Sequence, residues 1–152
     1  MNSGTNNLAN LARAGQLAAE RTSPGEIGRL LKGADDQLRD SSTESLSAAG
    51  RFMLAYNATH ALALAALRAE GYRPSTSQGH RKVIFQVLEA TADAPRALWV
   101  ALDRYHDRRN AAEYHGAPSA TEVEAKDLVE LAAKLQKLVL DRLKRSHPEL
   151  LK

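Results

Sequence analysis

The chain has no cysteine among its 152 residues, so neither a disulfide framework nor thiolate chemistry is available to it. Aromatic residues make up only 5% of the sequence while alanine is frequent, which favours closely packed helices over a β-sheet. Long apolar runs are also lacking, since the longest, Phe52 to Leu67, is interrupted by Asn57 and His60. With no secretory leader pattern either, we expect a soluble, cytoplasmic protein that does not contact a membrane.

The charge balance is mildly basic, with 21 Lys and Arg against 18 Asp and Glu and a net charge of +3. This permits a polyanionic partner such as RNA without requiring one. No glycine-rich phosphate loop, zinc-ligand spacing or Ser-His-Asp arrangement is visible. His106 and His115 are nine residues apart, on opposite sides of a helix, and cannot form a helical metal pair. We therefore expect no metal and no cofactor.

Hydrophobic spacing and capping residues predict an all-α chain. Ser23-Pro24-Gly25-Glu26 is a capping box with proline in the first turn, and it opens a helix that runs to about Asp40. Further helices are expected from about residue 46 to 70, from 80 to 92, from 96 to 115, and from a second capping box at 119–122 to about 146. A loop is expected over 72–79. The predicted units are an N-terminal segment, 1–22, partly helical or flexible; a single helical domain, 23–147; and a tail, 148–152.

Residues 104–118 carry many ionisable groups on a helix that should bury an apolar stripe. Arg109 continues the helical series of Leu98 and Leu102, so we expect it to face the core. A guanidinium in that position is costly unless it meets a carboxylate, a phosphate or an open cleft. Glu113, four residues further along the same face, is one available partner.

The end of this helix is marked by His115, which stands directly before Gly116 and three residues before Pro118. A histidine in a last helical turn feels the negative end of the helix dipole, which favours its protonated form. A group that gains and loses a proton readily near neutral pH is suited to proton transfer.

The segment Arg109-Asn110-Ala111-Ala112-Glu113-Tyr114-His115 resembles the signature of the HEPN superfamily. In that signature an arginine, usually followed by a polar residue, precedes a histidine by about four to six intervening residues. Residues 52–74 and 79–84 are similar to the long second helix, glycine-bearing loop and third helix of many bacterial HEPN proteins. The resemblance covers roughly residues 26–145.

What the resemblance implies is a HEPN-like antiparallel bundle of four to five helices, a homodimer, and in many members a metal-independent endoribonuclease. Such enzymes are often the toxin of a toxin–antitoxin or defence system, so a cognate antitoxin, nucleotidyltransferase-like or other, is a possible partner. The catalytic residues would be Arg109 for the phosphorane charge, His115 for proton transfer and Asn110 for orientation. The substrate-binding residues would be Arg108, Arg104, Glu113 and Tyr114.

Helical geometry limits how one motif could act. Arg109 and His115 lie six steps apart, about 120° round the helix, so they do not easily reach one phosphate together. Either the last turn opens near Gly116, or two motifs meet across a dimer axis. Arg108, seven residues before His115, shares its face.

A non-catalytic alternative stays open on the same residues. In it Arg109 and Glu113 form an intrahelical ion pair, and His115 is a helix cap. The protein would then be a HEPN-fold helical module that binds RNA, a nucleotide or a protein partner.

Overall fold

The computed structural model describes residues 3–75 and 82–152. In this part the chain is mostly helical (74%), with seven α-helices packed as a bundle and one small two-stranded sheet. The predicted helical bundle is confirmed at this level, and the sheet was not predicted. The elements are α1 Ser3–Arg13, β1 Leu17–Ala19, α2 Pro24–Asp40, α3 Ala48–Ala69, β2 Tyr72–Pro74, α4 Val83–Gln86, α5 Leu88–Ala92, α6 Arg96–Tyr114, α7 Glu122–Ser146 and a final 3-10 helix, Pro148–Leu151.

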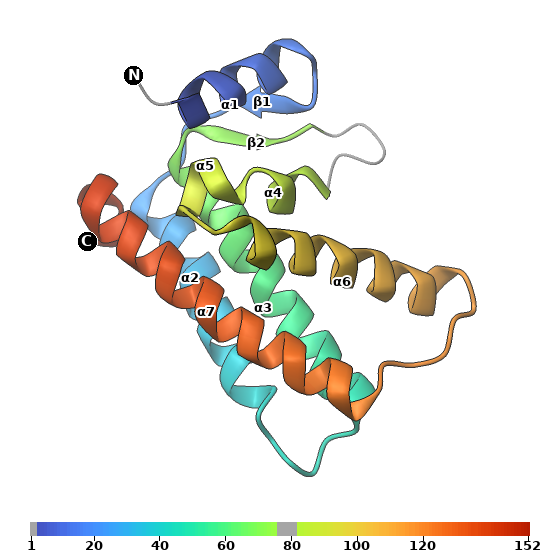
Figure 1. The fold of residues 1–152 in the computed structure, drawn as a ribbon. Coiled ribbons are helices and arrows are strands. Elements are labelled where there is room, and N and C mark those ends of the chain that lie inside the picture. The colour runs from blue at the N-terminus through green and yellow to red at the C-terminus, as the bar shows by residue number, and fades with distance from the viewer. Residues whose placement is uncertain (1–2, 76–81) are drawn as a thin grey trace.

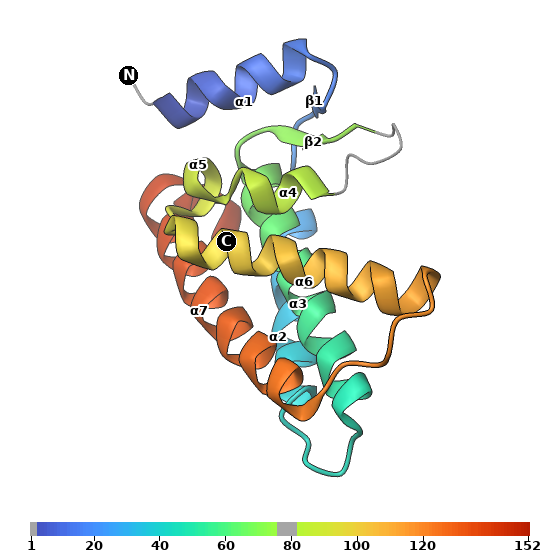
Figure 2. The same ribbon diagram turned by 45° about the vertical axis from the view of Figure 1, so that its right-hand side comes forward.

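The long helix α3 is the centre of the molecule, packed chiefly against α2 and α7 (Figure 1). Alanine is the most frequent residue at its buried positions, which lets neighbouring helices approach closely. Larger side chains, including Ile27 from α2, Leu62 from α3 and Leu135 from α7, are fully buried between the three helices. In both ribbon views α6 lies across α3, and its C-terminal end projects beyond the neighbouring helices (Figure 2).

Helix α2 begins as its sequence predicts, with one change of partner. Ser23 is the N-cap, its hydroxyl accepts a hydrogen bond from the Glu26 amide at 3.1 Å, and Pro24 stands in the first turn. The Glu26 carboxylate does not close the box on the Ser23 backbone. It instead accepts hydrogen bonds from Thr22 and from Arg68 of α3. A predicted local contact is thus replaced by a long-range one.

Arg68 is almost fully buried and has all its guanidinium nitrogens bonded. Its Nε and Nη2 donate to the two carboxylate oxygens of Glu26 at 3.0 and 2.9 Å. Its remaining hydrogen bonds go to the backbone carbonyl oxygens of Glu20, Arg21 and Tyr72. Because Arg68 also holds the Glu26 carboxylate in its charged form, the pKa of Glu26 is lowered. The arginine therefore fastens the N-terminal segment and β2 to α3.

The two short strands pair with each other although more than fifty residues separate them in the sequence. β1 pairs antiparallel with β2, with Leu17 opposite Pro74 and Ala19 opposite Tyr72. Residues 72–74 were predicted to be loop, and three-residue strands with no alternating pattern give little signal of their own. The rest of that expected loop, from 76 onward, lies outside the described residues. The pairing lays α1 and β1 over one end of the molecule (Figure 2).

Three predicted helix boundaries are wrong. The helix expected from 80 to 92 is two short helices, α4 and α5, which meet at Val87; positions 80 and 81 lie outside the described residues. The helix expected from about residue 46 begins at Ala48, because Ser47 is its N-cap. The second capping box lies two residues later than predicted, on Thr121 and Glu124, whose side chains and backbone amides bond reciprocally.

Candidate functional site

The candidate site lies on the C-terminal half of α6. The helix is regular to Tyr114, and His115 follows as its C-cap. The amides of His115 and Ala117 both donate to the carbonyl oxygen of Ala111 at 3.1 Å. Gly116 then turns the chain with φ at +72°, a left-handed conformation that favours glycine. The helix therefore stops where the sequence predicts, and its last turn does not open before His115.

Arg109 is half-buried and points toward α3, as its place in the apolar series predicts. Its guanidinium carbon lies 5.2 Å from the ring centre of Tyr56 and 5.6 Å from that of Tyr114, within cation–π range. One Nη donates to Asn110 Oδ1 at 3.1 Å. Among the described residues no carboxylate pairs with it, and its buried Nε has no hydrogen-bond acceptor. A positive charge is thus held in place by aromatic rings without being neutralised.

The ion pair between Arg109 and Glu113 that the non-catalytic alternative requires is not formed in this structure. Glu113 is exposed, and its carboxylate forms no ion pair with any described residue. Arg104 is likewise exposed and unpaired within the described part of the chain. The positive charge of Arg104 is therefore available to solvent, as a phosphate-binding residue would need.

A chain of polar side chains leads from Arg109 into the core. Because Asn110 Oδ1 accepts from Arg109, its Nδ2 faces His106 Nε2, at 3.2 Å. A nitrogen that accepts a hydrogen bond carries no proton, so we assign the imidazole proton to Nδ1, which lies 2.8 Å from the Tyr56 hydroxyl oxygen. Burial lowers the pKa of His106, which agrees with a neutral ring.

Sequence reasoning missed this role of His106 and Tyr56. His106 follows Leu102 by four residues and precedes Asn110 by four, so its place on the inner face of α6 was readable. Its partner Tyr56 is 50 residues away on α3, and no spacing rule links the two. Asn110 therefore touches both Arg109 and His106, as a residue that orients the site would.

Arg108, next to Arg109, has a different environment. Its guanidinium makes two hydrogen bonds to the Glu124 carboxylate, at 2.8 and 3.2 Å, and others to the carbonyl oxygens of Pro118 and Ser119. This pairing raises the pKa of Arg108 and lowers that of Glu124 to about 2, with the Thr121 amide as a further cause. Arg108 thereby fastens the connection between α6 and α7.

A small hollow of about 100 Å³ lies beside these residues, between α3, α6 and the connection to α7. Of the seven residues expected at the site, Arg108, Arg109 and Glu113 line it, and Tyr114, which contacts Arg109, lies outside its wall. Asn110, Arg104 and the exposed His115 are not part of its wall. One protomer thus brings Arg108 and Arg109 together at the hollow and leaves Arg104 and His115 outside it.

Residues 3–75 and 82–152 contain neither a metal-binding cluster nor a membrane-spanning helix. No group of three or more His, Asp or Glu side chains is arranged to hold a metal ion. No helix is both long enough and apolar enough to cross a membrane. Comparisons of the chain with protein-family models, with curated proteins and with solved structures each gave no match.

Proposed function

We propose that this chain is a cytoplasmic, metal-independent endoribonuclease of the HEPN type, acting as the toxin of a toxin–antitoxin or defence system. The observation that carries the proposal is the state of Arg109. Its guanidinium is fixed by Tyr56, Tyr114 and Asn110, yet within residues 3–75 and 82–152 it has no carboxylate partner and one of its N–H groups has no acceptor. Arg109 also lines the hollow between α3 and α6, and a guanidinium without a carboxylate partner at such a place has affinity for an anion such as a scissile phosphate.

The reaction requires no cofactor. A base removes the proton from a ribose 2′-hydroxyl, whose oxygen attacks the adjacent phosphorus, and the bond to the 5′-oxygen breaks as that oxygen takes up a proton. The products are a 2′,3′-cyclic phosphate and a 5′-hydroxyl. His115 would transfer the protons, and Arg109 would stabilise the charge that develops on the phosphorane oxygens. Asn110 would keep the guanidinium oriented, and Arg104 would bind a flanking phosphate.

A symmetric homodimer would overcome the separation of Arg109 and His115 on the helix. Because α6 stays helical to Tyr114, the two side chains remain about 120° apart within one protomer. The end of α6 projects from the molecule, where a second copy could meet it (Figure 1). Two motifs facing across a two-fold axis would offer one His115 as base and the other as acid.

One observation favours the second candidate, a non-catalytic RNA-binding module. Arg108 is the arginine that shares the helical face of His115, and its charge is already neutralised by Glu124. It is therefore not free to bind a phosphate beside that histidine. With that cation engaged, Arg109 and Arg104 remain as the cations for a transition state. A module of this kind would bind RNA with strong salt dependence and leave it intact.

The test is cleavage of a mixed tRNA and mRNA pool in the presence of chelator. We expect the wild-type protein to produce 2′,3′-cyclic phosphate ends, and His115→Ala to slow cleavage by about 10² to 10⁴. His115 is exposed, and no hydrogen bond or ion pair in the described part of the chain involves its side chain, so this variant should fold normally. Lys126→Ala, an exposed residue of α7, is the matched control.

The RNA-binding module predicts a different result in the same experiments. If the wild-type protein slows the migration of the RNA in a gel-shift assay but does not cut it at any salt concentration tested, the endoribonuclease proposal is rejected. Salt-sensitive binding that survives in His115→Ala would then identify the RNA-binding module and leave His115 as a helix cap.

A further inference from the structure

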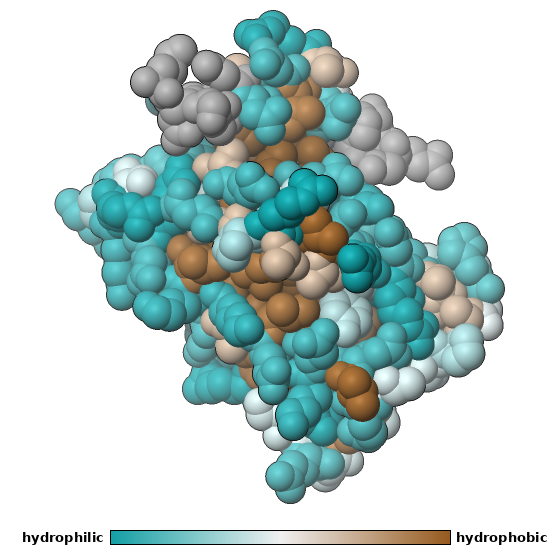
Figure 3. All heavy atoms as spheres, viewed as in Figure 1, coloured by the Kyte–Doolittle hydropathy of each residue, from teal (hydrophilic) through white to brown (hydrophobic). Residues whose placement is uncertain are grey.

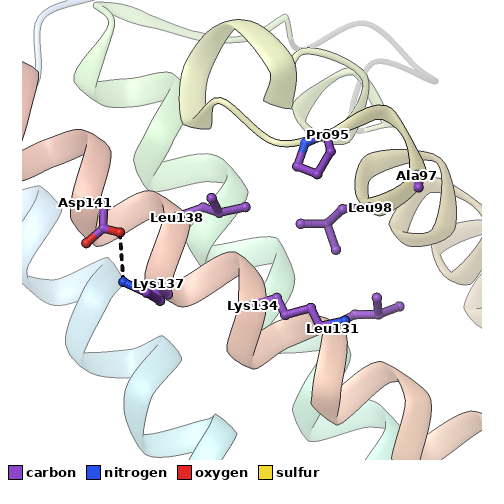
Figure 4. Close-up of a pocket in the computed structure, with 8 residues that line it drawn as sticks. All are labelled: Pro95, Ala97, Leu98, Leu131, Lys134, Lys137, Leu138 and Asp141. Carbon is purple, nitrogen blue, oxygen red and sulfur yellow. Dashed lines mark hydrogen bonds and ion pairs between the residues drawn. The ribbon is translucent and has the colours of Figure 1, made fainter.

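A second concave site lies far from the motif, between the first turn of α6 and the middle of α7. It encloses about 450 Å³, within the range of roughly 300–1,000 Å³ that is usual for small-molecule sites. Figure 4 shows the side chains of Pro95 and Leu98 facing those of Leu131 and Leu138 across this space. Leu98 is eleven residues before Arg109, about 16 Å along the helix, so the groove is separate from the proposed RNA site.

The apolar surface of this groove is short. On α7 it is supplied by Leu131 and Leu138, seven residues apart on one face. The next positions of the same series are Glu124, bonded to Arg108, and Arg145, paired with Asp93. In Figure 3 the corresponding brown patch, in the middle of the face, is surrounded by hydrophilic residues. A partner helix would need a longer stripe, with anchors spread over several turns, so a small ligand fits this surface better.

The charge at the rim selects the ligand. Lys134 and Lys137 stand on α7 at the edge of the groove, with Asp141 beside them. Lys137 is paired with Asp141 at 3.0 Å (Figure 4), whereas no described carboxylate pairs with Lys134. One uncompensated ammonium therefore lies next to an apolar floor. The complementary molecule has an apolar body and a single negative end.

We infer that this groove binds a small amphipathic carboxylate of the fatty-acid class. Its hydrocarbon chain lies against Leu98, Leu131 and Leu138 and removes their exposed surface from water. Its carboxylate pairs with Lys134. The site is independent of the proposed RNA cleavage, since it shares no residue with the motif.

The test is binding of decanoate below its micelle concentration, followed by calorimetry and by methyl NMR shifts of Leu98, Leu131 and Leu138. We expect saturable binding to the wild-type protein. Lys134→Met keeps the aliphatic stem and removes the charge, so it should weaken binding about two- to fivefold. Ala97→Phe places a ring from an exposed position of α6 into the groove and should abolish binding. Lys126→Met, on α7 outside the groove, should bind like the wild type.

Specific results would overturn the inference. Absence of saturable decanoate binding would do so, as would equal binding by Ala97→Phe, with folding of each variant checked by circular dichroism. Decanol bound as tightly as decanoate, with no effect of Lys134→Met, would reject the carboxylate. An acidic amphipathic peptide that shifts these methyl groups when decanoate does not would show that the face binds a protein helix instead.

Discussion

Two arginines, one on α3 and one that packs against it, differ in whether their charge is paired with a carboxylate. Arg68, near the C-terminal end of α3, makes five hydrogen bonds, two of them to the Glu26 carboxylate. Arg109, which reaches α3 from α6, contacts two aromatic rings and one amide oxygen, and its Nε has no acceptor among the residues that the structure describes. A guanidinium that serves the fold, as that of Arg68 does, has its charge paired with a carboxylate inside the protein. One that is fixed but left charged is suited to an external anion, and variants at both positions test this difference.

The largest effect on stability is expected from Arg68→Met. The change leaves the Glu26 carboxylate without its cation and three carbonyl oxygens without their donor, and breaking a buried pair in this way costs about 3–5 kcal/mol. Urea denaturation monitored by circular dichroism measures the loss. Arg21→Met, an exposed arginine whose backbone carbonyl is retained, is the control. A loss below about 1 kcal/mol would show that the bonded network of Arg68 contributes little to the fold.

A smaller effect is expected from Glu124→Gln, which removes the charge that Arg108 faces. Because both side chains are about three-quarters buried, we expect a loss of about 1–2 kcal/mol at pH 7. The folded pKa of Glu124, about 2, lies below its ordinary value, so the stabilisation is complete above about pH 4.5 and is lost as pH falls toward 2. The wild type should therefore lose stability over this interval more steeply than the variant. The control is Glu130→Gln, an exposed residue of the same helix. Parallel pH profiles for wild type and Glu124→Gln would contradict the assignment.

The contrast between the two arginines also shows what the sequence could predict. Arg109 was readable, because it interrupts an apolar series at helical spacing and stands in a recognisable pattern with His115. Arg68 was not, since nothing in an alanine-rich helix indicates that Glu26, 42 residues earlier, would receive it. The pairing of Arg108 with Glu124 was not predicted for the same reason. Local spacing reports the face of a helix, whereas the partner on that face depends on how distant elements pack.

The elements of the fold can likewise be separated into those with a local cause in the sequence, which were predicted, and those without one, which were missed. Helix ends with a local cause, such as Ser23 before α2 and Gly116 after α6, were predicted from the sequence. The β1–β2 pairing was missed because its strands are three residues long and more than fifty residues apart. The division at Val87 of the helix expected over residues 80–92 was also missed. We find no sequence feature that accounts for it.

The smallest effect on stability, and the sharpest test of the comparison, is expected from Arg109→Met. Methionine keeps an apolar side chain between Tyr56 and Tyr114, so the fold should lose only about 0.5–1 kcal/mol from the cation–π contacts. Cleavage of RNA should fall by about 10² to 10³, because the cation that faces the developing charge is gone. Arg68→Met should show the opposite pattern. It should lose much more stability, while the rate of RNA cleavage per folded molecule stays unchanged. Denaturation and cleavage assays on both variants separate the two roles. If Arg109→Met destabilises the protein as much as Arg68→Met, and binding of an RNA oligonucleotide is unchanged, Arg109 is a second structural arginine and its missing acceptor carries no functional meaning.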